Sequence, residues 1–406
     1  MRETNFKHTD IGPIPHDWNV KSTDELFDIS AAGDLMTLYY SPERTQKHKY
    51  PIYSNSCVNK GLYGYTSFPR YTKGAFTITG RGNLGVAEYR DSDFDAIIRL
   101  LILKPKKDVS SRFFALYTNF ARPYEGSATS IPQLSIPNVS KGLVAVPPFA
   151  EQEAIGKALS DVDELIDSLR KLIDKKRNIK QGAMSCLLTG KRRLPGFTSP
   201  WTTNELDQIG IIIPNNSLSW DCLTSEGTVA DIHYGQILTK FGAVVDVSKT
   251  SLPYIKSNYE PRFLKSNIAQ DGDVIFADTA EDDTVGKAIE LTNIEDAIVV
   301  SGLHTFWFRP TIRFASKFLG YALNEFDFHS QIPPLSTGTK VSSISKPNLL
   351  KLVLSYPADI KEQETIAKIL TDMDNEIESL EKKLAKYEQV KQGMMSELLT
   401  GKIRLI

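Results

Sequence analysis

The sequence contains one segment of 44 residues twice, and this duplication limits the chain to folds built from two similar halves. The copies are EQEAIGKALSDVDELIDSLRKLIDKKRNIKQGAMSCLLTGKRRL, from Glu151, and EQETIAKILTDMDNEIESLEKKLAKYEQVKQGMMSELLTGKIRL, from Glu362. They align without a gap at a shift of 211, and 25 of the 44 positions are identical. Upstream the similarity continues more weakly, because LLILKP ending at Pro105 pairs with TFWFRP ending at Pro310. We therefore expect each half to consist of a globular part followed by a helix.

Within both copies, apolar side chains recur alternately every three and four residues. The two apolar stripes consist of Ile155, Leu159, Val162, Ile166, Leu169 and Ile173, and of Ile366, Leu370, Met373, Ile377, Leu380 and Leu384. A mean spacing of 3.5 residues keeps a narrow stripe facing a partner helix, so the pattern predicts that the helices form an antiparallel coiled coil. Helices of this length extend roughly 55–60 Å. The alternative is that each helix packs on its own globular domain. Gly190 and Gly401 follow Leu-Leu-Thr where a left-handed cap would end each helix.

The remaining segments show the alternation typical of β-strands. Short β-branched runs such as GAFTITG, GDVIFAD and HTFWFR are separated by Gly, Asp and Asn. We predict an α+β fold with two tandem, β-rich pseudo-repeat domains separated by the two long helices. The expected boundaries are 1–146 and 196–356 for the globular domains, and 147–195 and 357–406 for the helical segments.

The stretch Gly80-Arg81-Gly82-Asn83-Leu84-Gly85 matches the dinucleotide-binding pattern G-x-G-x-x-G. That motif binds a cofactor only where the glycines lead from a strand into a helix. Here the alternating run VAEYR follows, which predicts a second strand, and the second copy has ADTAEDDTV in place of the glycines. We interpret the stretch as the tip of a β-hairpin.

Composition and motifs argue against several other classes. The chain is 41% hydrophobic and 24% charged, has no run of about 18 apolar residues, and begins with a polar segment unlike a signal peptide. Cys57, Cys186 and Cys222 are isolated, and the six histidines are scattered, so no metal site is expected. No catalytic constellation repeats across the halves. We expect a cytoplasmic protein that is not an enzyme and has no cofactor.

Two β-rich domains, each followed by a helix that opens with Glu-Gln and ends in LLTGK, resemble the specificity subunits of type I restriction–modification enzymes. The most specific pieces are Glu151-Gln152 with Leu187–Lys191, Glu362-Gln363 with Leu398–Lys402, Ser301–His304, and GRGNLGVAEY. The resemblance covers nearly the whole chain. It implies that each domain is a target-recognition domain for one half of a bipartite double-stranded DNA target. It also implies that the helices set the spacer and dock two methyltransferase subunits, and that endonuclease/translocase subunits join the complex.

The charge of the two domains differs. Residues 20–146 contain 16 basic and 11 acidic side chains, whereas residues 204–355 contain 12 and 18. An acidic domain is a poor DNA binder by itself. Either its positive charge is concentrated on one face, or the methyltransferase partners supply most phosphate contacts, and we favour the second explanation.

Candidate DNA-contacting residues are polar or basic side chains on the expected loops, because such groups hydrogen-bond to base edges and phosphates. In the first domain they are Ser54, Asn55, Lys60, Tyr63, Arg81, Asn83, Ser127, Thr129 and Gln133. In the second domain they are Lys256, Ser257, Asn258, Thr279, Thr284, Lys287, His304, Thr339 and Lys340. Each has an alternative as a turn or capping residue, and the apolar neighbours of His304 favour a structural histidine. We expect Tyr63, Tyr65 and Trp307 to be core aromatics rather than base-stacking residues.

Two other functions remain open at this point. The first alternative is the specificity subunit of a related restriction system that is not type I. The second is a coiled-coil scaffold that binds only protein. A scaffold predicts no sequence-dependent DNA footprint in the presence of its partners.

Overall fold

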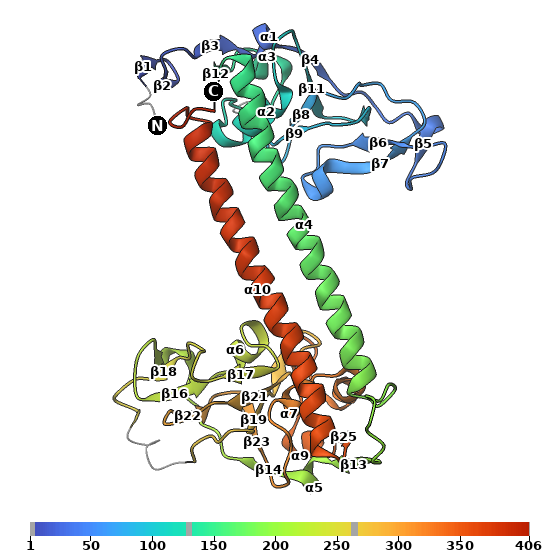
Figure 1. Cartoon of the computed structure of the whole chain (residues 1–406), viewed down its shortest axis with the longest axis vertical. Helices are drawn as coiled ribbons and strands as arrows, with labels where there is room; N and C mark the ends of the chain where they lie inside the picture. The colour runs from blue at the N-terminus through green and yellow to red at the C-terminus, as the bar shows by residue number, and fades with distance from the viewer. Residues whose placement is uncertain (1–4, 127–131, 261–266, 406) are drawn as a thin grey trace. The chain divides into compact units, whose positions relative to one another are not determined.

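The computed structural model describes residues 5–126, 132–260 and 267–405 of the chain. The chain divides into two compact units, the first comprising residues 1–170 with 382–406 and the second comprising residues 171–381. Two long helices, α4 (Phe149–Leu187) and α10 (Ile360–Leu398), each contribute one end to each unit (Figure 1).

The first unit combines short strands with one medium helix and several single-turn helices. Its strands are β1 (Phe6–Thr9), β2 (Gly12–Pro15), β3 (Asn19–Ser22), β4 (Phe27–Ala31), β5 (Tyr40–Ser41), β6 (Tyr50–Tyr53), β7 (Leu62–Thr66), β8 (Phe76–Thr79), β9 (Ala87–Tyr89), β10 (Asp95–Ala96), β11 (Leu100–Pro105) and β12 (Leu143–Val146). Its shorter helices are α1 (Thr23–Leu26), α2 (Ser111–Ala121) and α3 (Ile136–Ser140). The larger sheets have the orders β4-β11-β8-β9 and β10-β6-β7-β5.

The hairpin predicted for the glycine-rich stretch is present. Strands β8 and β9 pair antiparallel, with Phe76 opposite Tyr89 and Ile78 opposite Ala87. The connecting loop contains Gly82 (φ +76°) and Gly85 (φ +79°), a left-handed backbone that favours glycine. A hairpin has no helix N-terminus to receive a pyrophosphate, so the dinucleotide interpretation is excluded on geometry.

The second unit repeats this arrangement. Its strands are β13 (Trp201–Glu205), β14 (Gly210–Ile213), β15 (Leu223–Thr224), β16 (Val229–Ile232), β17 (Val244–Asp246), β18 (Tyr254–Ile255), β19 (Val274–Ala277), β20 (Thr279–Ala280), β21 (Ala288–Thr292), β22 (Ile298–Ser301), β23 (Thr305–Pro310), β24 (Ser342–Ser343) and β25 (Val353–Pro357). Its shorter helices are α5 (Leu206–Ile209), α6 (Tyr234–Thr239), α7 (Phe318–Ala322), α8 (Phe326–His329) and α9 (Lys346–Leu350). The larger sheets have the orders β14-β23-β19-β21-β17 and β15-β18-β16-β22.

The two units share one strand plan. In the first unit β11 lies between β4 and β8, and in the second unit β23 lies between β14 and β19 in the same antiparallel manner. Parallel pairing of β10 with β6 likewise corresponds to that of β22 with β16. The weak upstream similarity between the two halves of the sequence therefore reflects a duplicated fold.

The predicted helix pair is present, and its direction is antiparallel. In the first unit α4 and α10 are linked by Asp163–Lys391 and Arg170–Glu388, both at 2.6 Å. In the second unit Lys176–Glu376 lies at 2.6 Å and Lys180–Asp374 at 2.5 Å. Residue numbers rise along α4 as they fall along α10 within each unit, which confirms the α+β fold with an antiparallel pair of long helices (Figure 1).

The predicted apolar stripes are buried along both helices. The fully or nearly buried members are Ile155, Leu159, Ile166, Leu169, Ile173, Ile366, Leu370 and Ile377, and the half-buried members are Val162, Met373, Leu380 and Leu384. The helix ends also enter the domain cores, because Ile155 and Leu159 share a core with Leu398 and Leu399 from the end of α10. Packing against a globular domain, posed above as the alternative, thus accompanies helix pairing, and α10 packs on the first domain at its end.

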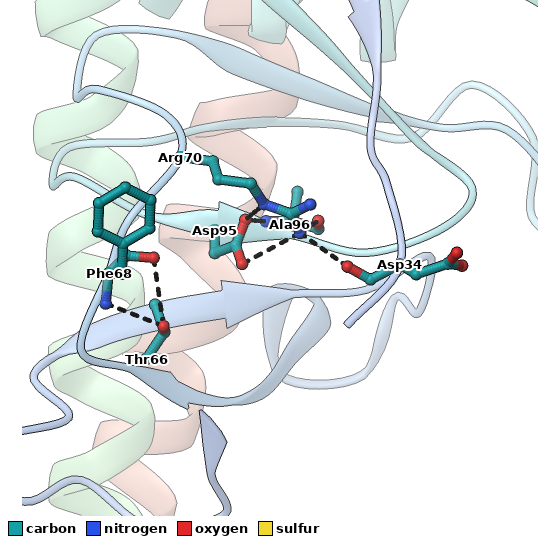
Figure 2. A network of polar contacts seen from close by, with 6 residues as sticks. All are labelled: Asp34, Thr66, Phe68, Arg70, Asp95 and Ala96. Atoms are coloured by element: carbon teal, nitrogen blue, oxygen red, sulfur yellow. Dashed lines mark hydrogen bonds and ion pairs between the residues drawn. The ribbon is translucent and has the colours of Figure 1, made fainter. Parts of the chain in front are cut away.

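One buried ion pair shapes the lobe of the first unit that carries β5, β6, β7 and β10. Asp95 is 1% exposed, and the Arg70 guanidinium donates to it through Nε at 2.5 Å and Nη2 at 3.1 Å (Figure 2). The same Nη2 donates to the carbonyl oxygens of Asp34 (3.1 Å) and Ala96 (2.9 Å). This hydrogen bonding to Asp95 raises the pKa of Arg70. Arg70 therefore joins β10 to the segment after β4 and holds the lobe in place.

Candidate nucleic-acid interface

Both units build the same junction where the long helices meet the globular domain. At the first helix junction Arg404 donates to Glu151 at 2.6 and 2.7 Å and also pairs with Asp17, while Trp18 Nε1 donates to Glu151 at 3.1 Å. At the second, Arg193 donates twice to Glu362 at 2.6 Å. Glu151 and Glu362 are 0% and 1% exposed. These hydrogen bonds raise the pKa of both arginines, Arg404 mainly through Glu151 and Arg193 through Glu362.

The glutamine after each of these glutamates makes matching contacts. Gln152 accepts from the backbone N–H of Ser110 (2.9 Å) and donates to the carbonyl of Pro147 (2.8 Å). Gln363 accepts from Ala315 (2.9 Å) and donates to Pro357 (2.8 Å). The Glu-Gln motif of the sequence therefore fastens each helix to its domain.

The glycine of each LLTGK motif lies against a tryptophan at the same junction. Gly190 (φ +69°) approaches Trp201, and Gly401 (φ +70°) approaches Trp18. Both helices end three residues before these glycines, at Leu187 and Leu398. The left-handed conformation was predicted correctly, and the glycine serves the turn that follows the helix.

Polar side chains gather at one corner of the first unit, defined here as the exposed Arg81, Asn83 and Arg99 with the half-buried Asn55 and Gln133. The corner lies where β6 and β8 end and where β11 begins. The Asn55 amide accepts from the backbone N–H groups of Gly80 (2.6 Å) and Arg81 (3.3 Å), and it donates to the carbonyl of Arg81. Arg81 pairs with Gln133 in an isolated antiparallel bridge. Asn83 Nδ2 lies 3.6 Å from Cys57 Sγ.

Arg99 is the second arginine of this corner. Its Nη1 donates to Gln133 Oε1 at 3.0 Å, and the residue is exposed. A Cβ atom on Gly80 would lie 2.6 Å from the Arg99 carbonyl oxygen, so the backbone here permits only glycine at position 80. The corner thus presents two exposed arginines and an asparagine, side chains suited to base edges and phosphates.

Other residues predicted for the first domain lie outside this corner. Ser54 closes its own loop by donating to the carbonyl of Gly61 at 3.2 Å, and Tyr63 packs against Tyr40 with 48% of its surface exposed. Lys60 lies 3.8 Å from Asp167 of α4. Ser127 and Thr129 lie outside the described residues.

Lys60 also borders a hollow in the lobe of the first unit. Basic and tyrosine side chains line the hollow, including Arg44, Lys49, Tyr50, Tyr53, Lys60 and Tyr65. Lysine and arginine beside tyrosine hydroxyl groups suit contact with a phosphate backbone. The expected core position is wrong for Tyr63, which is exposed, and Tyr65 is only half-buried. Trp307 is buried as expected and donates to Asp273 at 2.8 Å.

The second unit has an equivalent corner, defined here as Asn215, Asn216, Asp278 and His304, which line one pocket together with Ser217, Leu218 and Leu303. His304 Nδ1 lies 3.3 Å from Asp278 Oδ1, and the His304 side chain is 50% exposed. The imidazole also meets the ring of Tyr234 edge-on at 5.3 Å. His304 has φ +54°, a strained value for a residue with a side chain.

Two asparagine side chains stabilise the second corner through hydrogen bonds. Asn215 Nδ2 donates to the carbonyls of Gly302 (3.0 Å) and Thr305 (2.9 Å). Asn216 Nδ2 donates to buried Asp231 at 2.6 Å. These bonds hold the turn that presents His304.

Burial controls ionisation in the second corner. It raises the pKa of Asp231 to about 6 despite the opposing hydrogen bond from Asn216, and it raises the pKa of Asp278 despite His304. Burial, and secondly the charge of His304, lowers the pKa of His233. Burial therefore moves the ionisation of Asp231 and Asp278 to higher pH than that of an exposed aspartate.

Several residues predicted for the second domain are engaged by the protein itself. Lys287 Nζ donates to the carbonyls of Leu238 (3.2 Å) and Phe241 (2.9 Å), and burial lowers its pKa. Thr279 is 8% exposed and donates to the carbonyl of Ser342. Thr284 donates to Asp282 in a local turn, and Lys256 Nζ donates to the carbonyl of Asp221 at 2.6 Å.

The other predicted residues of this domain lie on exposed loops. Ser257 and Asn258 follow β18, and Thr339 and Lys340 precede β24. Among the residues predicted for this domain, His304 lines the pocket of the second corner.

Sequence reasoning missed Arg99, Asn215, Asn216 and Asp278. A signal for Arg99 was available, since aligning LLILKP with TFWFRP places Arg99 opposite His304. The asparagines and Asp278 carry no comparable signal, because their partners lie far away in the sequence.

Within the described residues, no group of histidine, cysteine or acidic side chains is arranged to hold a metal ion. The same part of the chain contains no helix that meets the length and apolarity of a membrane span.

Comparison with known proteins finds the same similarity over both halves. The family model described as "Type I restriction modification DNA specificity domain" matches residues 15–176 and again 198–389. The MjaVIII type I restriction enzyme specificity subunit of Methanocaldococcus jannaschii is 27% identical over 292 residues, which cover 66% of this chain and 65% of that protein. The putative MjaX specificity subunit of the same organism is 25% identical over 443 aligned positions, covering 100% of this chain and 98% of that protein.

A solved structure has the same fold. The crystal structure of a type I restriction–modification system S subunit from M. genitalium aligns with a TM-score of 0.64 at 14% identity. The alignment covers 98% of this chain and 99% of the other.

Proposed function

Because the chain belongs to the family of type I restriction modification DNA specificity domains, we propose that it is the sequence-specific DNA-recognition subunit of a type I restriction–modification complex. Each globular domain recognises one half of a bipartite double-stranded target. The paired helices set the length of the unread DNA between the halves and dock two methyltransferase subunits. Endonuclease/translocase subunits join this assembly in the cytoplasm, and the chain itself contributes recognition rather than catalysis.

One observation carries this proposal. The two domains keep the same helix junctions, down to the Gln152 and Gln363 hydrogen bonds, while their exposed corners carry different side chains. A protein that recognises two unlike short sequences needs an identical frame and divergent contact surfaces. A scaffold that binds two copies of one protein partner has no need for divergence at equivalent corners.

The length of the helices suits a bipartite target. Each helix has 39 residues, so its axis extends about 58 Å at 1.5 Å per residue. That length corresponds to at most about 17 base pairs, and half-sites about one helical turn apart fall within it.

Charge suggests how phosphate contacts are shared. The first domain has an excess of basic side chains, and the second has 12 basic against 18 acidic residues in 204–355. Since nonspecific affinity depends on neutralised phosphates, we propose that the methyltransferase subunits supply most phosphate contacts for the second half-site. Nanomolar affinity of the isolated chain at physiological salt would contradict this part of the proposal.

The test is the methylome of cells that express this chain together with its cognate methyltransferase subunits. The expected result is one split motif with two unlike halves and a fixed spacer. Methylation at a continuous motif, or no methylation that depends on this chain, would refute the proposal. A sequence-independent complex with protein partners would instead support the scaffold alternative.

A further inference from the structure

We infer that Arg99 and His304, which occupy the same position in the two units, determine one base pair each in the two halves of the target and help to make those halves different. This inference rests on the proposed function and adds residues to it.

The equivalence of the two positions follows from strand register. Leu100, the first residue of β11, is paired with Thr79 at the end of β8. Thr305, the first residue of β23, is paired with Ala277 at the end of β19. Arg99 and His304 immediately precede these two residues, so both side chains emerge at the same corner of an equivalent sheet.

The neighbours of the two positions also correspond. In the first unit Arg81 bridges to Gln133, and in the second unit Thr279 pairs with Ser343 on β24. In each corner, therefore, the residue two positions after the end of β8 or β19 pairs antiparallel with a segment that precedes the long helix. The strand pairing is the same in the two corners, whereas the local backbone differs, because His304 has a left-handed φ of +54° and Arg99 does not have a positive φ.

Both side chains are exposed yet held in position. Arg99 is anchored through Nη1 to Gln133 Oε1 at 3.0 Å. The ring of His304 is anchored between Asp278, 3.3 Å from Nδ1, and Tyr234. Anchoring of this kind lowers the entropy lost on binding and fixes the direction in which the remaining donors point.

The backbone at His304 adds a separate indication. A histidine at φ +54° is strained, and glycine would relieve the strain, yet the turn carries an imidazole that is half-exposed. Strain at a solvent-facing polar residue is typical of positions retained for binding.

The chemistry of the two side chains predicts different preferences. A guanidinium fixed at one edge still offers two parallel donors, the geometry that matches O6 and N7 of guanine. Arg99 is therefore assigned to a guanine in the first half-site. The imidazole of His304, with Nδ1 directed to Asp278, has only Nε2 for the DNA, so it makes a single hydrogen bond and discriminates less.

The experiment compares methylomes of cells that express the full chain with its cognate methyltransferase subunits, in wild-type form and as Arg99→Ala or His304→Ala. Arg99→Ala should relax one position of the first half-site, with discrimination falling roughly 10- to 100-fold, and leave the second half-site and the spacer unchanged. His304→Ala should relax one position of the second half-site only, by roughly 10-fold or less.

Matched controls remove a charge at the opposite ends of the same strands. Lys107→Ala follows the end of β11, and Arg313→Ala follows the end of β23; both residues are exposed. Both controls should keep the wild-type motif. If an alanine variant fails to accumulate, Arg99→Lys and His304→Asn are used. Each keeps a hydrogen-bond donor group without the original geometry and should give partial relaxation at the same positions.

The outcomes separate this inference from the proposed function. A wild-type methylome without a split motif refutes the proposed function itself. A split motif that stays unchanged in both alanine variants overturns the inference alone. Uniformly weaker methylation with an unchanged motif also overturns it, because the corners would then contact phosphate or a protein partner rather than bases.

Discussion

The helix junctions and the exposed corners of the two units differ in how much they have diverged since the duplication. At the junctions, buried Glu151 and Glu362 each bind an arginine that follows the partner helix. At the corners, Arg99 on Gln133 in one unit corresponds to His304 on Asp278 in the other. A buried carboxylate without its partner is costly, so the junction tolerates little change. Changing a side chain on an exposed loop costs almost no folding stability, so the loop sequence can change together with the ligand that it binds.

A further pattern of hydrogen bonds, outside the helix junctions, is the same in the two units. Asn119 of α2 bonds both the N–H and the carbonyl of Ala87 at 2.8 Å. Asn324, after α7, does the same with Ala288 at 3.1 and 2.7 Å. The comparison shows that the two units share these hydrogen bonds of the frame, while the side chains at their exposed corners differ.

The largest expected effect comes from lengthening the two long helices while the corners are left unchanged. Seven residues inserted into α4 after Arg170, and seven into α10 after Glu381, preserve the heptad register and lengthen both helices by about 10 Å. The original target should be lost, and the methylome should show the same two half-sites with about three more base pairs between them. Altered half-sites would contradict this prediction, because the length of the helices would then affect which bases the corners recognise.

Truncating an equivalent leucine in each core should destabilise both units to a similar extent. Leu159 and Leu370 are both 0% exposed, and each alanine variant should lose about 2–5 kcal/mol of unfolding free energy, measured by urea denaturation. Leu172→Ala, at a side chain 38% exposed, is the control and should lose less than about 0.5 kcal/mol. A large loss at only one of the two core sites would show that the cores are not equivalent.

One buried acid predicts a pH dependence restricted to the second unit. Glu290 is 1% exposed, and burial raises its pKa to about 7, whereas Tyr89 occupies the equivalent strand position in the first unit. The folded protein keeps this proton up to about pH 7, while the unfolded chain releases it near its ordinary value of about 4.3. In that window the unfolded state binds fewer protons, so stability falls as pH rises.

The measurement compares wild type with Glu290→Gln. Between about pH 4.5 and pH 7, the wild type should lose on the order of 2 kcal/mol relative to the variant. The exposed Glu226→Gln is the control and should follow the wild type. Parallel curves for wild type and Glu290→Gln would show that the carboxyl is ionised throughout.

The smallest effect is expected from the exposed ion pairs between the helices. Arg170–Glu388 in the first unit and Arg177–Glu381 in the second are both 2.6 Å long, and all four side chains are more than 40% exposed. Double-mutant cycles should give about 0.5 kcal/mol or less for each pair, decreasing with salt. A coupling several times larger in one unit would mark a difference between the two helix segments.

Much of the fold was predictable because it is local. The alternate spacing of Ile155, Leu159 and Val162 predicts a paired helix from neighbouring residues alone, and Gly82 with Gly85 predicts a hairpin tip. The internal repeat added what a single segment cannot supply, since the loss of the glycines in the second copy argued against a cofactor site.

The candidate site was less predictable, for a physical reason. Thr279 and Lys287 have the composition of DNA-contacting residues, but their donors are used by the carbonyls of Ser342, Leu238 and Phe241. Whether a polar side chain is available to bind DNA depends on hydrogen-bond partners that lie far away along the chain. No local sequence pattern predicts these partners.

The sequence by itself determined the duplication, the pairing of the long helices and the family, because each follows from periodicity or from comparing one half with the other. Only the tertiary structure decided that Arg99 stands on Gln133 and His304 faces Asp278, 34 and 26 residues away in the chain. Contacts of that kind form when separate strands end at one corner. They depend on how the sheets pack rather than on the order of residues within any one segment.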